Sequence, residues 1–226
     1  MKKLLLLSIP FFASLHLASQ PSDTLQLLQL KAPDIYCVKV HTDIGDMVIE
    51  VNKEWASLAA DRFYQLVSSG FFTDTRFFRS NKKYLQFGIS SDSAVNAFWD
   101  RHPIKDEQVI RKNEAGTISF AMGGPNTRTT SVYFNKIDNP KLDTIQNSTG
   151  FPAFGKIIQG DSVLALFENK YEDSVVFKEW DSMMVKGNTY TDRVLPGLRR
   201  IIAMEIVACK LPDTKQSARK EESNKN

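Results

Sequence analysis

The sequence predicts a mainly β protein, a small barrel of short strands accompanied by two helices. Alternating apolar and polar residues run through 34–51 on both sides of a turn at Gly45, which is the pattern of a β-hairpin. Short strand-like runs then alternate with loops as far as Ile158, and a last one spans 198–210. The 226 residues include 15 Phe, which the aromatic lining of a small barrel would use.

Length and composition indicate one globular domain with short appendages. Hydrophobic residues make up 42% and charged residues 24%, an ordinary balance for a soluble domain. The net charge is +3, and Lys2 and Lys3 supply two of those charges, which leaves +3 − 2 = +1 for the rest of the chain. This charge gives no reason to expect binding to nucleic acid or to a membrane surface.

Residues 1–19 have the pattern of a secretory signal peptide, with a basic start, an apolar run and small residues before a cleavage point near Ser19. The alternative is an uncleaved membrane anchor. The apolar run falls short of the ~20 residues that span a bilayer, and Ser8, Pro10 and His16 interrupt it. We therefore expect an exported protein, periplasmic or secreted, without stable membrane insertion.

A spacer over 20–33 precedes the folded domain, which we place at 34–211. Helical periodicity predicts a first helix over 54–69, closed by Gly70 as its C-terminal cap residue. A second helix begins near Asp161, whose carboxylate we expect at the N-cap.

No metal site and no cofactor are expected. Apart from His16, the chain has only His41 and His102, and its two cysteines form no zinc-binding cluster. It also has no GxSxG motif and no glycine-rich phosphate loop.

The stretch 116–134, GTISFAMGGPNTRTTSVYF, is the most informative in the chain. It resembles the central signature of the cyclophilins, a class of peptidyl-prolyl cis-trans isomerases, in which G-T-[IL]-S-[FM]-A precedes a polar turn and S-Q-F-F. The first element is found here at 116–121, and we match the last to SVYF at 131–134.

Other elements follow in the order of the family and near its spacing. FFR at 77–79 matches Phe-His-Arg, QFG at 86–88 matches Gln-Gly-Gly, and FGKI at 154–157 matches Phe-Gly-[KR]-Val. Seven elements together cover about 38–167, and the match resumes at 201–210. The resemblance implies a closed eight-stranded antiparallel barrel capped by two α-helices, with peptidyl-prolyl isomerase activity.

The segment 171–197 is longer than the family's usual link between the second helix and the last strand. We interpret it as an insertion packed against the barrel, either an ordinary covered loop or a partner-binding flap. The tail, 212–226, has no apolar periodicity and is predicted to be disordered.

The first and last strands of a cyclophilin barrel are neighbours, so the resemblance brings Cys37 and Cys209 close together. In an exported protein this arrangement invites a disulfide. The alternative is two separate buried thiols, because directly opposed strand positions strain a disulfide.

Isomerisation of the peptide bond before proline is slow because C–N resonance must be lost, at a barrier of ~18–20 kcal/mol. A cationic donor near the prolyl nitrogen binds the twisted amide better than the planar one, since the nitrogen gains a lone pair as the bond rotates. Arg79 matches the catalytic arginine of the family, and arginine presents a rigid, permanently charged fork of donors. The alternative is an ordinary surface arginine.

The resemblance also implies a substrate-binding site. Its residues are Phe134, Gln86, Leu142, Phe151, Tyr84, Ala121 and Met122. Phe134 would form the floor of the slot for the proline ring, and Gln86 would bind the substrate backbone. For the aromatic members the alternative is plain core packing. We expect the partners to be proline-containing segments of unfolded or exported proteins, bound by a monomer.

Three of the departures from the family pattern concern the groove. Val132 replaces Gln, Phe87 replaces the first Gly of Gln-Gly-Gly, and Met122 stands where Asn or Arg is common. They predict fewer polar contacts and a narrower groove, hence reduced turnover or altered substrate preference. We expect an isomerase that assists the folding of exported proteins. The rivals are a catalytically weak binding module or chaperone for Pro-containing segments, and an interaction protein acting through 171–197.

Overall fold

The computed structural model of the chain describes residues 25–144 and 150–209. The predicted signal peptide, 1–19, and the predicted disordered tail, 212–226, lie outside the described residues. Across the described part, no helix has both the length and the apolar character needed to cross a membrane.

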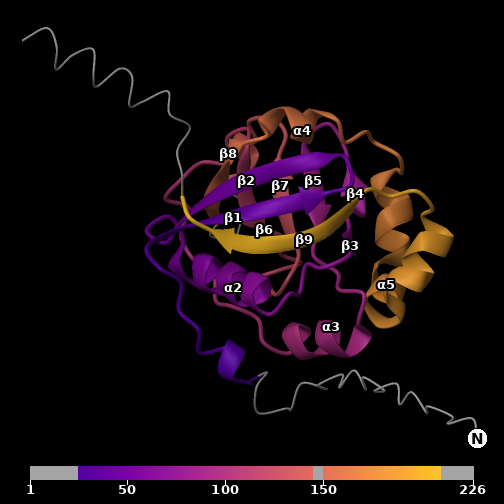
Figure 1. Cartoon of the computed structure of the whole chain (residues 1–226), viewed down its shortest axis with the longest axis horizontal. Coiled ribbons are helices and arrows are strands. Elements are labelled where there is room, and N and C mark those ends of the chain that lie inside the picture. The colour runs from indigo at the N-terminus through magenta and orange to yellow at the C-terminus, as the bar shows by residue number, and fades with distance from the viewer. Residues whose placement is uncertain (1–24, 145–149, 210–226) are drawn as a thin grey trace, which may run out of the picture.

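Within the described residues, nine antiparallel strands form one curled sheet (Figure 1), in the order β3-β9-β1-β2-β8-β6-β7-β5-β4. The strands are β1 (Ile35–Thr42), β2 (Gly45–Asn52), β3 (Thr75–Arg76), β4 (Arg79–Ser80), β5 (Tyr84–Phe87), β6 (Thr117–Phe120), β7 (Val132–Asn135), β8 (Ala153–Gln159) and β9 (Arg200–Val207).

The mainly β prediction is confirmed, but the expected closed ring of eight strands is corrected to a nine-stranded curled sheet over the described residues, with β3 and β4 at its two ends. Only Phe77 and Phe78 separate these two short strands in the chain. Phe77 belongs to the barrel core and Phe78 to a second hydrophobic cluster, so the chain breaks its strand pairing at this point.

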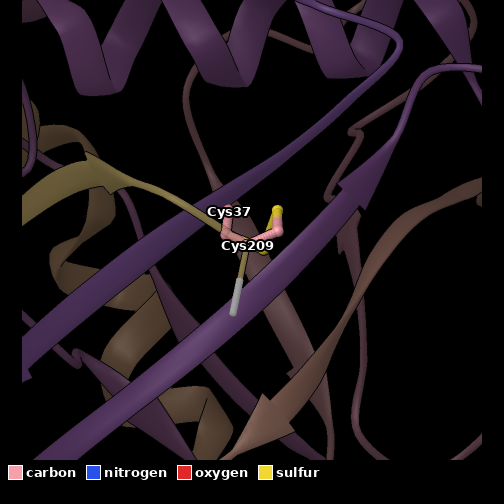
Figure 2. The surroundings of a disulfide bond; sticks show 2 residues. All are labelled: Cys37 and Cys209. Carbon is pink, nitrogen blue, oxygen red and sulfur yellow. A yellow bond between two sulfur atoms is a disulfide. The ribbon is translucent and has the colours of Figure 1, made fainter. Parts of the chain in front are cut away.

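Strand β1 carries both the predicted hairpin and a disulfide. It pairs with β2 on one side, Thr42 opposite Gly45, and with β9 on the other. A disulfide joins Cys37 to Cys209, just after β9, with the two Cα atoms 5.1 Å apart (Figure 2). Because Cys37 lies opposite Val207, Cys209 is beyond the directly opposed position.

Aromatic rings fill the interior of the sheet, as the phenylalanine content predicted. Phe63 contacts Phe72 and Phe154 at ring-centroid distances of 5.5 and 5.1 Å. Phe87 contacts Phe72 at 5.4 Å and Phe134 at 5.6 Å. All five rings are fully buried, so they form one continuous core behind the strands.

Helix α2 (Ser57–Ser68) confirms the first predicted helix. Gly70 follows it at φ +70°, the left-handed conformation in which glycine commonly ends a helix. A further helix, α3 (Ser93–Asp100), was not predicted. Its N-cap is Asp92, whose side chain accepts hydrogen bonds from the amides of Ala94 and Val95.

Helix α4 (Asp161–Ala165) lies where the second helix was predicted but has only five residues. Its N-cap is Gly160 and not Asp161, so that prediction is wrong by one position. Gly160 adopts φ +78°, and a Cβ there would lie 2.3 Å from the carbonyl oxygen of Asp46. The close approach of the chain to β2 therefore selects glycine at the start of α4.

The predicted insertion forms a long helix, α5 (Asp173–Val194), where a covered loop or a flap was expected. Its buried or half-buried side chains Val176, Trp180 and Met183 follow the helical period. They pack with Phe78 in the second hydrophobic cluster, and the rings of Phe78 and Trp180 meet edge to face at 5.2 Å. α5 thereby covers the β3–β4 side of the sheet (Figure 1).

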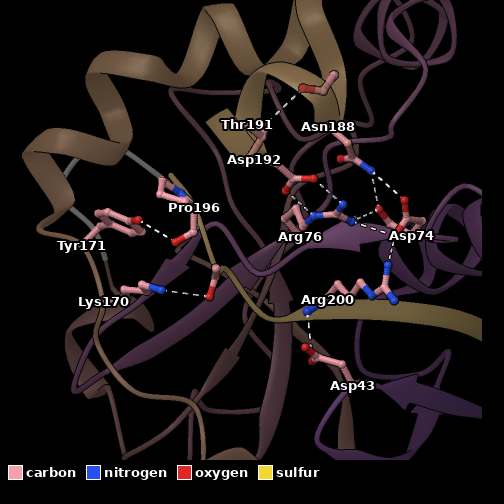
Figure 3. Close-up of polar contacts among 12 residues, drawn as sticks. Asp43, Asp74, Arg76, Lys170, Tyr171, Asn188, Thr191, Asp192, Pro196 and Arg200 are labelled. Carbon is pink, nitrogen blue, oxygen red and sulfur yellow. Dashed lines mark hydrogen bonds and ion pairs between the residues drawn. The ribbon is translucent and has the colours of Figure 1, made fainter. Parts of the chain in front are cut away.

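A bend divides α5 at Gly187, which has φ +64° and lies so close to the segment just before α3 that a Cβ would be 2.2 Å from the carbonyl oxygen of Ser91. Beyond the bend, Arg76 of β3 donates two hydrogen bonds of 2.8 Å to the carboxylate of Asp192 (Figure 3). These contacts hold α5 to the barrel at points away from its first turn.

Candidate active site

A cavity of about 310 Å³ lies beside β4, β5 and β7, and we call it the Arg79 groove. Its lining consists of Arg79, Tyr84, Gln86, Ala121, Met122, Tyr133, Leu142, Phe151 and Phe177. Every residue that the sequence predicted for the site lines this groove except Phe134. Leu142 comes from a 3₁₀ turn (Pro140–Leu142), and the others come from strands, loops and α5.

Arg79 is half-buried on β4 and lies opposite Gln86 of β5. Its Nη1 donates to the Gln86 side-chain oxygen at 3.1 Å. Its Nε and Nη2 donate to the two carboxylate oxygens of Asp173, at 2.9 and 2.5 Å. This two-point ion pair fixes the guanidinium plane and turns Nη1 toward the groove. In return, Arg79 holds the pKa of Asp173 below its usual range.

Two aromatic rings cover the guanidinium of Arg79. Its Cζ atom is 5.1 Å from the ring centroid of Tyr84 and 5.0 Å from that of Phe177. Such contacts are attractive because the face of an aromatic ring is electronegative. Arg79 is thus held in one orientation by neighbours on two other elements, β5 and α5.

Gln86 connects Arg79 to Ser131, the residue just before β7. It is almost fully buried, and its side-chain nitrogen donates to the hydroxyl of Ser131 at 2.9 Å. With its oxygen occupied by Arg79 and its nitrogen by Ser131, the amide is oriented by partners on both sides. The hydrogen-bonded series Arg79–Gln86–Ser131 forms the polar edge of an otherwise apolar groove.

The prediction that Phe134 forms the floor of the groove is wrong. Phe134 is fully buried in the barrel core, opposite Leu85 and Ile118 on the neighbouring strands. Side chains alternate between the two faces of a strand, so the residue before it, Tyr133, faces the groove instead. Aligning the family element S-Q-F-F one residue earlier in the chain puts its last Phe on Tyr133. The sequence does not decide between the two alignments, because the last position is aromatic in both.

Tyr133 presents a neutral aromatic surface. Burial raises the pKa of its hydroxyl well above the usual range, and the hydroxyl donates to the side-chain oxygen of Asn113 at 3.2 Å. Its ring meets Tyr84 and Phe151 edge to face, at 5.4 and 6.0 Å. Together with Leu142 these rings give the groove an apolar wall of the kind that a proline ring would contact.

Two of the three departures from the family pattern have no contact with the groove. Val132 and Phe87 are fully buried and belong to the barrel core. The expected loss of a polar contact at Val132 and the expected narrowing at Phe87 are therefore wrong, since Ser131 supplies the polar partner of Gln86. Met122 does line the groove, as predicted.

Asp173 and Phe177 line or contact the groove and were not predicted from the sequence. Both lie in the first two turns of α5, four positions apart and therefore on one helix face. Asp173 is 94 residues from Arg79 in the chain, and no local pattern links them. Only the docking of α5, which packs Val176 against the barrel side, brings them to the groove.

A second cavity, of about 450 Å³, continues the groove and shares four of its lining residues, Gln86, Ala121, Met122 and Phe177. It extends to Ser131, Trp180 and the carboxylates of Asp100 and Asp181. The site is therefore elongated, with an apolar end at Tyr133 and a more polar end between α3 and α5.

The chemistry available here is non-covalent. Within 25–144 and 150–209, no group of His, Cys, Asp or Glu side chains is placed to hold a metal ion. What the groove offers is an oriented guanidinium, an oriented amide and an apolar wall. These groups can position a peptide and favour one distribution of charge over another.

Comparisons with known proteins agree with this geometry. The family model for "Cyclophilin type peptidyl-prolyl cis-trans isomerase/CLD" matches residues 37–187. The chain is 31% identical over 143 residues to a Rhizopus delemar "Peptidyl-prolyl cis-trans isomerase-like 3", covering 58% of this chain and 81% of that protein. To the Homo sapiens protein of the same name it is 27% identical over 157 residues, covering 67% and 94%.

Solved structures show the same fold. A Cryptosporidium parvum cyclophilin-type peptidyl-prolyl cis-trans isomerase aligns with a TM-score of 0.56 at 19% identity, over 78% of this chain and 99% of that one. The same protein in the presence of the dipeptide Ala-Pro gives a TM-score of 0.54 at 20% identity, over 76% and 99%. The family match, the relatives and the fold together establish that the chain belongs to the cyclophilin-type peptidyl-prolyl cis-trans isomerases.

Proposed function

We propose that the Arg79 groove accelerates cis-trans isomerisation of peptide bonds that precede proline, with Arg79 as the catalytic residue. One observation carries this: the Arg79 guanidinium is oriented at the edge of an apolar cavity floored by Tyr133. The Ala-Pro dipeptide named for the related Cryptosporidium structure supports the substrate class.

In the proposed mechanism the proline ring lies against Tyr133, between Leu142 and Phe151. Nη1 of Arg79 then donates to the prolyl nitrogen as it becomes pyramidal, so the guanidinium stabilises the twisted amide more than either planar form. Gln86 holds the neighbouring backbone, which keeps the amide in reach while it rotates. No bond to the protein forms or breaks.

The physiological substrates in this proposal are proline-containing segments of exported proteins. The signal-peptide pattern of 1–19 supports export. The Cys37–Cys209 disulfide also supports it, because such bonds persist in oxidising compartments. An exported folding catalyst fits both observations.

The rival is a module that binds proline-containing segments with little turnover. It draws support from the ion pair between Arg79 and Asp173, which occupies two of the donor positions of the proposed catalytic group. In this alternative the groove binds a peptide but stabilises the twisted amide little more than the planar one.

A protease-coupled isomerisation assay on the mature domain separates the two. We expect a rate above the spontaneous one, and an Arg79→Ala variant that falls by about 10²-fold or more, the usual effect of removing a donor that acts in the transition state. Comparison of the NMR spectra of the variant and the wild type checks that the variant is folded. A wild-type rate at the spontaneous level, together with measurable peptide binding, would support the binding module and reject the isomerase.

A further inference from the structure

The first turn of α5 places a carboxylate on the proposed catalytic residue. Asp173 accepts from Nε and Nη2 of Arg79 and also from the side-chain amide of Asn81, at 3.2 Å from each carboxylate oxygen. The side chain of Arg79 is 18% exposed, so solvent screens this pair only in part. The guanidinium and the carboxylate together carry no net charge.

This neutralisation reduces the positive charge of Arg79, on which the proposed isomerisation mechanism depends. A charged donor makes a hydrogen bond roughly twice as strong as that of a neutral donor. Asp173 pairs with Nε and Nη2 of Arg79, and Nη1 is on the side of the groove. The positive charge behind Nη1 is therefore largely compensated by the carboxylate. The prolyl lone pair exists only in the twisted amide. Charge compensation therefore reduces the stabilisation of the transition state by Arg79 and leaves binding of the planar substrate almost unaffected.

Arg79 does not depend on Asp173 alone for its position. Gln86 accepts from Nη1, and the rings of Tyr84 and Phe177 lie 5.1 and 5.0 Å from the guanidinium carbon. α5 is likewise held elsewhere, by the Arg76–Asp192 pair and by a 3.1 Å hydrogen bond from the Asn96 side chain to the carbonyl of Met184. Removing the Asp173 charge therefore leaves both the helix and the guanidinium supported.

We propose that Asp173 limits the rate of the Arg79 groove: by compensating the charge of Arg79, it holds turnover below that of an unpaired guanidinium in the same position. This inference rests on the proposed isomerase function and deepens it. Asp173 touches no substrate in this account and acts through Arg79. The helix that carries it is the segment that the sequence marked as an addition to the family's usual chain.

The test compares Asp173→Asn with the wild type by NMR exchange spectroscopy on a proline-containing peptide, which yields kcat and KM separately. Asparagine keeps the size of the side chain and one acceptor oxygen but removes the charge. We expect kcat to rise about fivefold, which corresponds to the difference of about 1 kcal/mol between hydrogen bonds of charged and of neutral groups. KM should change by less than about twofold because only the transition state is stabilised further.

Two further variants control for other causes. Asp173→Glu keeps the charge, so its kcat should stay below that of Asp173→Asn. Asp192→Asn removes the matching two-point pair between α5 and Arg76, outside the groove, and should leave kcat unchanged (Figure 3). The Arg79 Nε–H resonance reports the pair itself, since its exchange with water should speed up in Asp173→Asn and remain slow in Asp192→Asn.

Several outcomes overturn the inference. An unchanged or reduced kcat in Asp173→Asn, with wild-type catalysis that still depends on Arg79, rejects it and leaves the isomerase assignment standing. A rise that appears equally in Asp192→Asn shows that loosening of α5 is responsible. A change in KM alone shows that α5 blocks entry to the groove. If neither the wild type nor Asp173→Asn exceeds the spontaneous rate, the isomerase proposal fails and this one with it.

Discussion

Replacing either of two adjacent aromatic residues by leucine tests which one belongs to the groove. Tyr133→Leu removes the ring that faces Tyr84 and Phe151, and Phe134→Leu removes a ring from the barrel core. The replacement residue is the same, and the two positions lie on opposite faces of β7. The structure predicts similar losses of stability and very different losses of activity.

The expected stability losses follow from the contacts. Phe134 is fully buried and stacks on Phe87, so its replacement by a smaller residue lowers the free energy of unfolding by about 1–2 kcal/mol. Tyr133 loses a hydrogen bond to Asn113, worth about 1 kcal/mol, and two edge-to-face contacts. Both variants should remain folded at low temperature and melt a few degrees below the wild type.

Activity should separate the variants. Loss of the aromatic floor removes a contact with the proline ring of at least about 1.4 kcal/mol, so Tyr133→Leu should lower kcat/KM about tenfold or more. Phe134→Leu should change it by no more than about twofold. The protease-coupled assay at 10 °C, with folded protein quantified by circular dichroism, gives both values. Equal losses, or the larger loss in Phe134→Leu, would refute the assignment of the groove to the Tyr133 face of β7.

Three further predictions concern the frame around the groove. A Cys209→Ser variant should lose about 2–5 kcal/mol of unfolding free energy in denaturant titrations, because the disulfide closes a loop of 172 positions, while its isomerase rate stays at the wild-type level; an unchanged midpoint contradicts this. Arg76 lowers the pKa of Asp192 and Arg79 lowers that of Asp173 from the ordinary 3.8, so both pairs contribute stability above about pH 4 that is lost as pH falls through the lowered values. Asp192→Asn should accordingly flatten the fall in stability below pH 4. Gly187→Ala should speed amide hydrogen exchange throughout α5, because Gly187 has φ +64° and an added Cβ would lie 2.2 Å from the carbonyl oxygen of Ser91. Amide protection equal to that of the wild type would contradict this prediction.

The part of the site that lies on strands and their adjoining loops could be predicted from the sequence. Arg79 and Gln86 sit opposite each other on paired strands, and their motifs fix their spacing. Ala121 and Met122 directly follow β6, within the strongest signature. Short-range sequence order determines such positions, so a family resemblance carries them over correctly.

The errors have physical causes. The prediction placed Phe134 where Tyr133 lies, because a one-residue shift in a strand exchanges its two faces while both residues remain aromatic. The strand count failed at Phe77 and Phe78, which divide one extended run into β3 and β4 at opposite ends of the sheet. Neither distinction is visible without the pairing partners.

The contribution of α5 could not be predicted. Val176, Trp180 and Met183 follow the helical period, but charged residues surround them in the sequence, and the prediction for this segment is a covered loop or a partner-binding flap. Even a correct helix would not have shown that Asp173 meets Arg79, because that contact depends on how two hydrophobic clusters pack. Long-range ion pairs of this kind follow from tertiary structure alone.

The central claim is that the Arg79 guanidinium lowers the barrier to rotation of a prolyl peptide bond. The most direct measurement is the exchange rate between the cis and trans signals of an Ala-Pro peptide, recorded by NMR with wild-type protein and with Arg79→Ala at concentrations where each binds. The account predicts exchange well above the spontaneous rate with the wild type, and near-spontaneous exchange with the variant despite binding. Equal acceleration by both proteins would contradict it.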